Sequence, residues 1–181
     1  MKINLSSKDE NHLNKFKKSI DGEDLKIDKG LQNSFGTITE YARLEANSAT
    51  MTKDLKALGC VERKSLILKF PTEEQVPKEL IMHFIRGYYD GDGSFTFGSG
   101  KYPQASLNFI GTMDFLIGVK ENLKVVTPIK IDKRKNIPYL MFGGNKNALE
   151  KLNMMYKDAT IYLDRKYNNY KILKSKFENK N

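Results

Sequence analysis

The 181-residue sequence contains very few cysteine and histidine residues, and this excludes several kinds of functional site. Cys60 is the single cysteine, so neither a disulfide framework nor a cysteine-rich zinc site is available. His12 and His83 are the two histidines and lie far apart in the sequence, so neither a histidine metal cluster nor a Ser/His/Asp catalytic triad is expected. Any chemistry must therefore depend on aspartate, lysine and the backbone.

The sequence also lacks any uncharged apolar run of membrane-spanning length. Its first ten residues carry charges where a signal peptide needs an apolar stretch. We therefore expect an intracellular protein, in the cytoplasm or an organelle matrix, that is not secreted and has no membrane partner. The length allows one large domain or two small ones.

Acidic and basic residues nearly balance in the first part of the chain but not in the second. Residues 1–75 carry a net charge of +1, whereas residues 76–181 carry +8 of the total +9. A basic field of this kind favours a polyanionic partner, and nucleic acid is the leading candidate because no membrane-type amphipathic stretch is present. The alternative is a lysine-rich surface that is only solvated.

Residues 76–94, VPKELIMHFIRGYYDGDGS, combine a helical pattern with two acidic residues. Pro77 suits a first helical turn, where its missing N–H is not needed. The apolar residues after it recur at helical spacing: Leu80, Phe84, Ile85 and Tyr88. We expect Tyr88 and Tyr89 to belong to the core, and the helix to end at the acids.

The end of this helix has unusual chemistry. Gly87 and Gly91 lie four residues apart, so one side of the helix is nearly bare backbone and allows a second helix to approach closely. Asp90 and Asp92 lie where backbone carbonyls are unpaired and the helix dipole is negative. That position repels carboxylates unless a cation or a donor compensates, and a divalent metal is the natural compensator.

Two simpler interpretations of the acidic segment exist. Asp-Gly-Asp-Gly is a common turn sequence for reasons of backbone chemistry alone. A calcium loop would place Asp90, Asp92 and Ser94 at its first, third and fifth positions. The sixth and twelfth positions would then be Phe95 and Lys101, where such a loop needs glycine and glutamate, so the calcium interpretation fails.

The remaining chain alternates between predicted strands and helices. Strands are expected at 2–6, 25–28, 37–46, 94–98, 105–110, 127–132 and 137–142, helices at 8–20, 49–58, 112–123 and 146–155, and a basic helical tail after residue 161. Residues 30–36 are expected to form a loop. Alternation gives the hairpin after Gly93 an apolar face (Phe95, Phe97, Leu107, Phe109) and a polar face (Ser94, Thr96, Ser106, Asn108).

The order of these elements repeats. The strands and helices of residues 2–58 follow the same order as those of residues 105–155. Arg63-Lys64 comes after the first set, and Arg165-Lys166 comes 102 positions later, after the second. The helix and strand of residues 76–98 have no counterpart in the first set.

With this repeat, the sequence resembles the LAGLIDADG homing endonucleases. Residues 85–93, IRGYYDGDG, match the motif that names the family, with Arg86 where a small residue is usual. The segment is similar to variants in intron- and intein-associated members. The resemblance implies an α+β fold of αββαββα units, in which two units form a saddle of antiparallel sheets over DNA. Residues 72–181 would be a complete unit with a basic tail, and residues 1–71 an N-terminally incomplete βαββα repeat.

The resemblance implies a site-specific double-strand DNA endonuclease that depends on Mg²⁺, with Mn²⁺ able to substitute. Asp92 and a backbone carbonyl near Gly91 would bind the metal, which would activate water and stabilise charge on the scissile phosphate. Gly87, Gly91 and Asp90 would lie at the interface between two motif helices.

In some family members a lysine after the last helix of the unit lies near the attacking water. By position, Lys166 and Lys64 are the candidates for this catalytic role, and either could instead be surface charge. The polar faces of the sheet would contact DNA bases and phosphates through Thr96, Ser99, Lys101, Gln104, Ser106, Asn108, Lys130, Arg134, Asn136 and Tyr139.

One chain with one motif offers one metal-binding acid, whereas a double-strand cut needs two. A homodimer, or a partner chain supplying the second motif helix, would restore the pair. The alternative function is a non-catalytic nucleic-acid-binding protein on the same scaffold, either an intron RNA splicing cofactor or a DNA-binding regulator. A small α+β domain whose motif helix is only a core element is a third interpretation.

Overall fold

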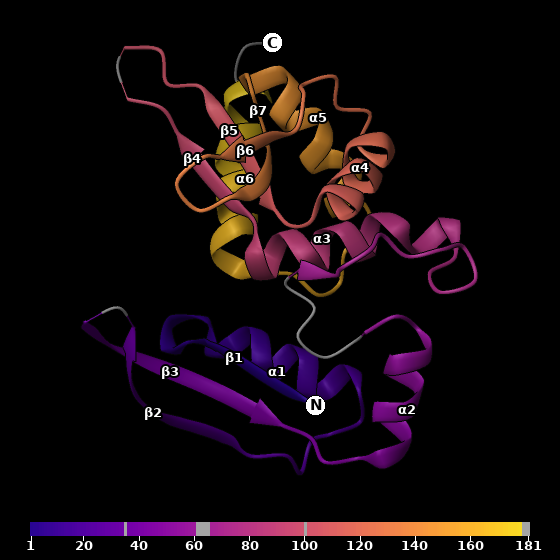
Figure 1. The fold of residues 1–181 in the computed structure, drawn as a ribbon. Helices are drawn as coiled ribbons and strands as arrows, with labels where there is room; N and C mark the ends of the chain where they lie inside the picture. Colours follow the sequence, from indigo (N-terminus) through magenta and orange to yellow (C-terminus); the bar gives the residue numbers. More distant parts are fainter. Residues whose placement is uncertain (35, 61–65, 100, 179–181) are drawn as a thin grey trace.

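The computed structural model describes residues 1–34, 36–60, 66–99 and 101–178. The chain forms two units, each with an antiparallel sheet and helices (Figure 1). The N-terminal unit contains β1 (Lys2–Ser6), α1 (Glu10–Ser19), β2 (Ile27–Ser34), β3 (Thr37–Glu45) and α2 (Ala49–Ala57). Short 3₁₀ turns at Ser7–Asp9 and Lys78–Leu80 precede α1 and the first helix of the second unit.

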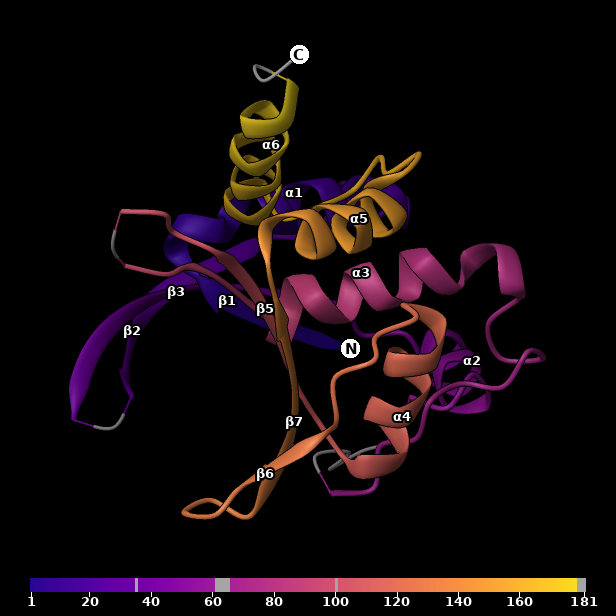
Figure 2. The ribbon, with the colours of Figure 1, turned by 90° about the horizontal axis from the view of Figure 1, so that it is seen from above.

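The C-terminal unit begins with the helix predicted from the motif. Its elements are α3 (Ile81–Asp92), β4 (Ser94–Phe97), β5 (Ala105–Ile110), α4 (Met113–Asn122), β6 (Lys130–Asp132), β7 (Ile137–Gly143), α5 (Asn145–Tyr156) and α6 (Asp164–Glu178). Viewed from above, α3 runs between α5 and α4 and contacts both (Figure 2).

The two sheets share their connectivity. The first has the order β1-β3-β2, and the second has the order β4-β5-β7-β6. The strands β1, β3 and β2 therefore correspond to β5, β7 and β6, with α1 and α4 at the same place in the chain order. Within the described residues, no strand pairs with the outer side of β1 as β4 pairs with β5. The common order agrees with the repeat seen in the sequence, and the incomplete repeat of residues 1–71 stays an interpretation.

The two units differ in the size of their cores. In the C-terminal unit, Ile85 and Tyr89 of α3 are fully buried against β5 residues such as Phe109 and α4 residues such as Phe115. Among the described residues, the N-terminal core has three fully buried members, Leu13, Ala42 and Leu44. Since each buried aliphatic or aromatic side chain contributes about 1.5–3 kcal/mol, the second unit is the better-supported platform for a site.

The predicted loop at residues 30–36 is wrong, because β2 continues to Ser34 and pairs with β3. Gly30 lies opposite Tyr41 in this ladder, and a Cβ atom at Gly30 would approach the Tyr41 hydroxyl oxygen to 2.8 Å. The glycine therefore makes room for an aromatic ring within a strand and does not interrupt the strand.

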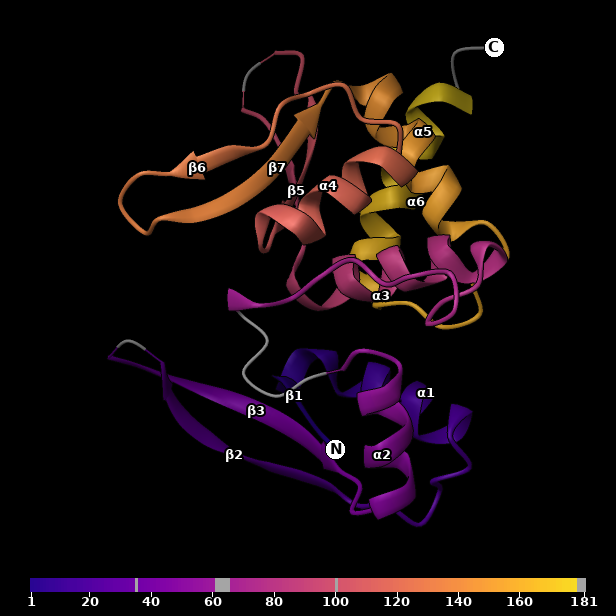
Figure 3. The same cartoon turned by 45° about the vertical axis from the view of Figure 1, so that its right-hand side comes forward.

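The long strands of both sheets extend to the same side of the molecule, and most helices lie on the other side (Figure 3). The units contact each other through α1, the turn before it and the start of α6. The Arg165 Nε atom donates to both carboxylate oxygens of Asp9 at 3.1 Å, and Asn11 donates to Asp164 at 2.7 Å. Among the described residues, no helix combines the length and apolarity needed to cross a membrane.

Candidate metal and nucleic-acid site

The C-terminal end of α3 is shaped by Gly93, because any larger residue there would displace Tyr89. The Gly93 amide donates to the Tyr89 carbonyl oxygen at 2.9 Å and closes the helix. A Cβ atom at Gly93 would lie 2.5 Å from the Tyr89 ring and 2.7 Å from its carbonyl oxygen. The chain therefore turns sharply after Asp92 and enters β4 at once.

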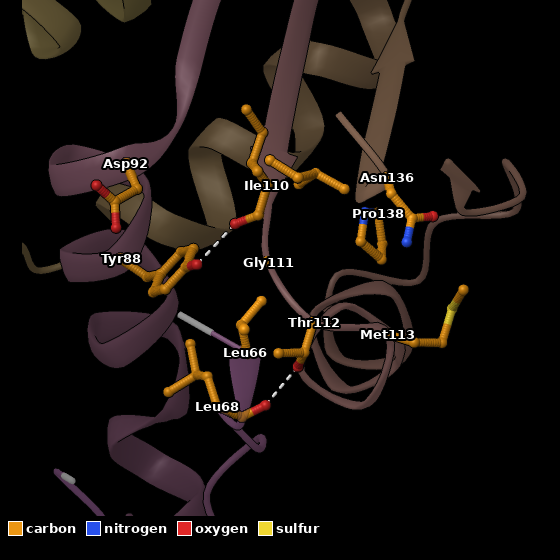
Figure 4. Close-up of a pocket in the computed structure, with 11 residues that line it drawn as sticks. Leu66, Leu68, Tyr88, Asp92, Ile110, Gly111, Thr112, Met113, Asn136 and Pro138 are labelled. Atoms are coloured by element: carbon orange, nitrogen blue, oxygen red, sulfur yellow. Dashed lines mark hydrogen bonds between the residues drawn. The ribbon is translucent and has the colours of Figure 1, made fainter. Parts of the chain in front are cut away.

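Asp92 is exposed at this end and borders a cavity of about 520 Å³. Asp92 and Tyr88 project from successive turns of α3 on one side of the cavity, with Asn136 and Pro138 across from them (Figure 4). The Tyr88 hydroxyl donates to the Ile110 carbonyl oxygen at 2.6 Å. Burial, with a contribution from the Asp92 carboxylate, raises the pKa of Tyr88 to about 12, so this hydroxyl is a neutral donor at physiological pH.

The other walls of the cavity are mostly apolar. They are formed by Leu66, Leu68, Ile110, Met113 and Ile137, together with the backbone of Gly111. The Thr112 hydroxyl donates to the Leu68 carbonyl oxygen and joins the segment before α3 to the start of α4 (Figure 4). Such walls do not suit a small charged substrate, so the polar chemistry of this region is at the cavity rim, where Asp92 lies.

The atoms near Asp92 fit a hard divalent cation in part. An exposed carboxylate beside the last carbonyls of a helix offers oxygen donors, the ligands that Mg²⁺ prefers. The described residues contain no group of three or more His, Cys, Asp or Glu side chains that could hold a metal by themselves. A cation here would therefore need further oxygen ligands from water, a phosphate group or another chain.

Asp90 does not lie at an open helix interface, and that prediction is wrong. Asp90 is 4% exposed and accepts hydrogen bonds from the Tyr156 hydroxyl at 3.2 Å and the Leu163 amide at 3.0 Å. Burial raises the pKa of the Asp90 carboxyl, while the Leu163 hydrogen bond and the Lys166 ammonium act in the opposite direction. Asp90 therefore fixes the segment after α5 against α3.

Arg86 is the departure from the usual small residue of the motif, and its side chain is also directed inward. Its guanidinium donates to the carbonyl oxygens of Ile161 and Met155, each at 3.1 Å. Arg86 and Asp90 thus bind the same stretch of chain from successive turns of α3. The residues around Arg86 carry no signal for these partners, because the partners lie about 70 residues away in the chain.

Lys166 lies against the end of α3, but its environment differs from that expected of a catalytic lysine. It is 1% exposed, and its ammonium donates to the carbonyl oxygens of Tyr89, Asp90 and Gly93. Burial lowers the pKa of Lys166 to about 8, although the Asp90 carboxylate acts in the opposite direction. A role beside an attacking water does not fit this geometry. Lys64, the other candidate, lies outside the described residues.

Gly87 and Gly91 form an open face. Both are exposed, and a Cβ atom built on either would meet nothing within 4 Å. Within the described chain no second helix packs on this face, so the expected helix interface stays a prediction. The face has the small residues that close helix packing requires.

The alternation predicted for the β4–β5 hairpin is confirmed. Leu107 and Phe109 are fully buried, and Phe95 and Phe97 pack against the core. On the other face, Ser94 pairs with Asn108 and Thr96 pairs with Ser106. The same face continues to Lys130 and Tyr139, which are paired between β6 and β7. The Asn108 Oδ1 atom is buried without a hydrogen-bond partner, although the face that Asn108 shares with Ser94 is partly exposed.

The remaining predicted DNA contacts lie in loops at two edges of the second sheet. Arg134 and Asn136 lie in the exposed β6–β7 turn, where Asn136 adopts a left-handed conformation with φ of 52°. Ser99, Lys101 and Gln104 lie between β4 and β5 and are exposed. The Gln104 side-chain oxygen accepts from the Asn145 amide at 3.2 Å, so part of this side chain is already used at the start of α5.

Sequence reasoning missed a second polar face, on the N-terminal sheet. Arg43 of β3 is paired with Asn4 of β1 and Asp28 of β2, and Thr39 is paired with Gln32. These side chains are on the face opposite the small apolar core, by strand alternation. The alternation of residues 37–46 was visible in the sequence and could have identified this face.

Comparisons with known proteins support the fold. No protein-family model matches the sequence, and no curated protein matches it. The solved structure of the I-SmaMI LAGLIDADG homing endonuclease bound to cleaved DNA is similar over 96% of this chain and 76% of its own, with 17% identity and a TM-score of 0.58. The I-LtrWI LAGLIDADG homing endonuclease bound to target DNA is similar over 99% of this chain and 79% of its own, with 11% identity and a TM-score of 0.58. This chain therefore has the LAGLIDADG homing endonuclease fold, as the motif predicted.

Proposed function

We propose that this chain is a site-specific DNA endonuclease whose Asp92 carboxylate and Gly91 carbonyl bind Mg²⁺. The observation that carries the proposal is the position of Asp92, an exposed acid at the end of the motif helix and next to the polar face of an antiparallel sheet. The fold supports it, because the similar solved structures are of homing endonucleases bound to DNA.

The proposed chemistry of the chain consists of holding the metal ion and positioning the backbone beside it. Bound Mg²⁺ would supply activation of water and stabilisation of charge on the scissile phosphate, and Mn²⁺ would substitute for it. Asp92 and Gly91 would hold the ion at the rim of the cavity. Tyr88 would stay neutral and keep the Ile110 backbone in place beside it. Asp90 takes no part, because its carboxylate is already used by two buried donors.

DNA would lie on the polar faces of the sheets. Lys101, Lys130 and Arg134 would contact phosphates, since exposed cations supply most of the salt-dependent affinity for DNA. Thr96, Ser106, Asn108 and Tyr139 would contact base edges or phosphates, because hydroxyl and amide groups serve both purposes.

A double-strand cut requires a second acid, and the open face of Gly87 and Gly91 suggests its source. A second motif helix packed on this face would bring two acid-bearing ends together. A homodimer supplies such a helix most simply, and a partner chain with its own motif helix is the alternative. Sedimentation at several protein concentrations, with and without DNA, separates these sources: a homodimer doubles its mass without any added chain.

The activity is tested by selecting duplexes from a randomised DNA library and then adding metal. Selection is done in Ca²⁺, and paired breaks are then mapped by sequencing after addition of Mg²⁺ or Mn²⁺. We expect wild-type protein to cut one selected sequence and Asp92→Asn to bind the same sequence without cutting. The matched control is Glu121→Gln, an exposed acid on α4, which should cut like the wild type.

A second candidate function is a non-catalytic binding protein, for intron RNA or for DNA. The buried state of Lys166 favours it, because the structure gives the ammonium no free donor for chemistry. Wild-type protein that binds a selected duplex or RNA tightly but cuts neither in Mg²⁺ nor in Mn²⁺ would favour this function. Protein that binds no nucleic acid at low salt would exclude both functions.

A further inference from the structure

The first turn of α6 contains three consecutive charged residues that reach two different parts of the molecule. Asp164 contacts α1 of the N-terminal unit, and Arg165 contacts Asp9 in the turn just before α1. Lys166 contacts the end of α3. A helical turn is stiff, so the positions of these three side chains are linked through a backbone that bends little. The N-terminal unit and the acid-bearing end of α3 are therefore joined through one short element.

Lys166 holds the backbone on both sides of Asp92. Its ammonium donates to the Asp90 carbonyl oxygen at 3.0 Å and the Gly93 carbonyl oxygen at 2.6 Å, and it also donates to the Tyr89 carbonyl oxygen. A lysine has three N–H donors and no acceptor, so every donor is used. These carbonyls lie at the end of α3, and the Tyr89 carbonyl oxygen also accepts from the Gly93 amide, so a buried cation and a backbone amide together close the helix end.

The contact with α1 is also well defined. Arg165 donates to both oxygens of Asp9, which is 8% exposed, so one partner of this ion pair is nearly buried. Asp164 accepts from Asn11 and from the Lys15 ammonium, which also donates to the Tyr162 carbonyl oxygen at 3.3 Å. The start of α6 is thus fixed to α1 by charged and amide groups of several residues.

We infer that the first turn of α6 couples the N-terminal unit to the end of α3, with Lys166 as the positioning residue that sets the backbone of Gly91 and Asp92. A shift of α1 moves Asp9, and with it Arg165, the start of α6 and Lys166. Residues 1–60 therefore influence the geometry of the acid-bearing end through the first turn of α6. The inference deepens the proposed function, because Asp92 and Gly91 are the metal ligands assigned there.

The inference is tested by the glycine amides, which report on the backbone without any cleavage assay. In protein labelled with ¹⁵N-glycine, hydrogen exchange is measured at Gly93 and at Gly118, which lies in α4. Lys166→Met keeps the length of the side chain but removes its donors. We expect exchange at Gly93 to rise about tenfold or more while Gly118 keeps its rate, because the loss is local. Lys171→Met, an exposed position on α6, is the control and should change neither rate.

A second variant tests the coupling and does not depend on how well Lys166→Met folds. Arg165→Gln removes the ion pair with Asp9 at the surface of α6. We expect the amide resonances of Gly91 and Gly93 to shift in this variant, although Arg165 donates to neither residue. Unchanged resonances in Arg165→Gln would contradict the coupling, and unchanged Gly93 exchange in folded Lys166→Met would contradict the positioning role.

A metal titration separates failure of this inference from failure of the proposed function. Mn²⁺ is added to each labelled protein in the presence of duplex DNA, and paramagnetic broadening of Gly91 is followed. We expect wild type to broaden at low Mn²⁺, Lys166→Met to need about tenfold more, and Asp92→Asn to show no specific broadening. If wild-type Gly91 is not broadened, the metal site is refuted while the exchange experiment still decides the role of Lys166.

Discussion

Two aspartates two positions apart in α3 have opposite environments, and each has a different consequence for the molecule. Asp92 is exposed at the rim of a cavity, whereas Asp90 is buried and binds Tyr156 and Leu163. The sequence identified both acids and favoured Asp92 as the metal ligand. It did not reveal that Asp90 is structural, because the donors to Asp90 come from a segment more than 60 residues away.

Because Asp90 is buried, we expect the loss of one of its hydrogen-bond donors to lower the stability of the protein. Tyr156→Phe removes the hydroxyl that donates to the Asp90 carboxyl group and leaves a buried acceptor with one fewer donor. We expect the free energy of unfolding to fall by about 1–3 kcal/mol, measured by urea denaturation. Tyr139→Phe, on the polar face of the sheet, is the control and should change it by less than about 0.5 kcal/mol. Equal stability of the two variants would show that the Tyr156 hydrogen bond contributes little.

The position of Lys130 leads to a prediction about the salt dependence of DNA binding. It is exposed on the polar face of the second sheet, so Lys130→Gln removes one cation that we assign to a phosphate contact. We expect the slope of log affinity against log salt concentration to become less steep by about 1. The loss of affinity should be similar for all DNA sequences. Fluorescence anisotropy at several salt concentrations measures the slope. Lys53→Gln, on α2, should leave the slope unchanged, and the same change in both variants would argue against a specific phosphate contact.

At the scale of elements, the sequence predicted what depends on local pattern. The helix ending at Asp92, the alternation of β4 and β5, and the helix that Thr112 caps were all confirmed. The loop at residues 30–36 was wrong, because the reason for Gly30 is the Tyr41 ring on the neighbouring strand. A contact between strands cannot be read from the residues next to a glycine, so this error has a physical cause.

From the open face of α3 we predict that one substitution raises stability and weakens association. Gly87→Ala places a Cβ atom in open space, and alanine favours the helix over glycine by about 0.5–1 kcal/mol. We expect the free energy of unfolding to rise by that amount at low protein concentration. If a second motif helix packs on this face, the added methyl group should weaken association, as seen by sedimentation.

The matched control on another helix is Gly118→Ala. A Cβ atom there would lie 2.1 Å from the Phe70 ring, so we expect this variant to be destabilised. A loss of stability in Gly87→Ala would show that the face is occupied within one chain. Unchanged association would remove the argument that this face receives a second helix.

At the scale of the whole molecule, the sequence predicted two related sets of elements but not how they meet. The order β1-β3-β2 matches β5-β7-β6, which agrees with the repeat read from the chain. The contact between the units joins Asp9, in the turn before α1, and Asn11 and Lys15 of α1 to the start of α6 and the segment before it. These are ordinary polar residues with no motif, and their partners lie about 150 residues away, so pattern reasoning could not find them.

This contact predicts a pH dependence. Hydrogen bonds from Lys15 and Asn11 hold the pKa of Asp164 below its ordinary value of 3.8. An acid with a lowered pKa in the folded state stabilises the protein above that ordinary value, and this stability is lost as pH falls through the folded-state pKa. Asp164→Asn should therefore be less stable than wild type at pH 7, by under about 1 kcal/mol because the pair is half-exposed, and the difference should vanish in acid.

Thermal unfolding at pH 7 and at pH 3 measures the Asp164 effect. Asp132→Asn, at the end of β6 in the C-terminal unit, is the control for the general loss of a carboxylate. A stability difference between wild type and Asp164→Asn that grows on acidification would contradict the sign of the effect.

The central claim is that the end of α3 is a metal-dependent catalytic site for DNA. The most direct measurement compares wild type and Asp92→Asn on one library-selected duplex, with binding measured in Ca²⁺ and strand breaks measured in Mg²⁺. We predict equal binding, paired breaks by wild type only, and no breaks without a divalent metal. Equal cutting by both proteins, or tight binding by wild type with no breaks, would contradict the claim.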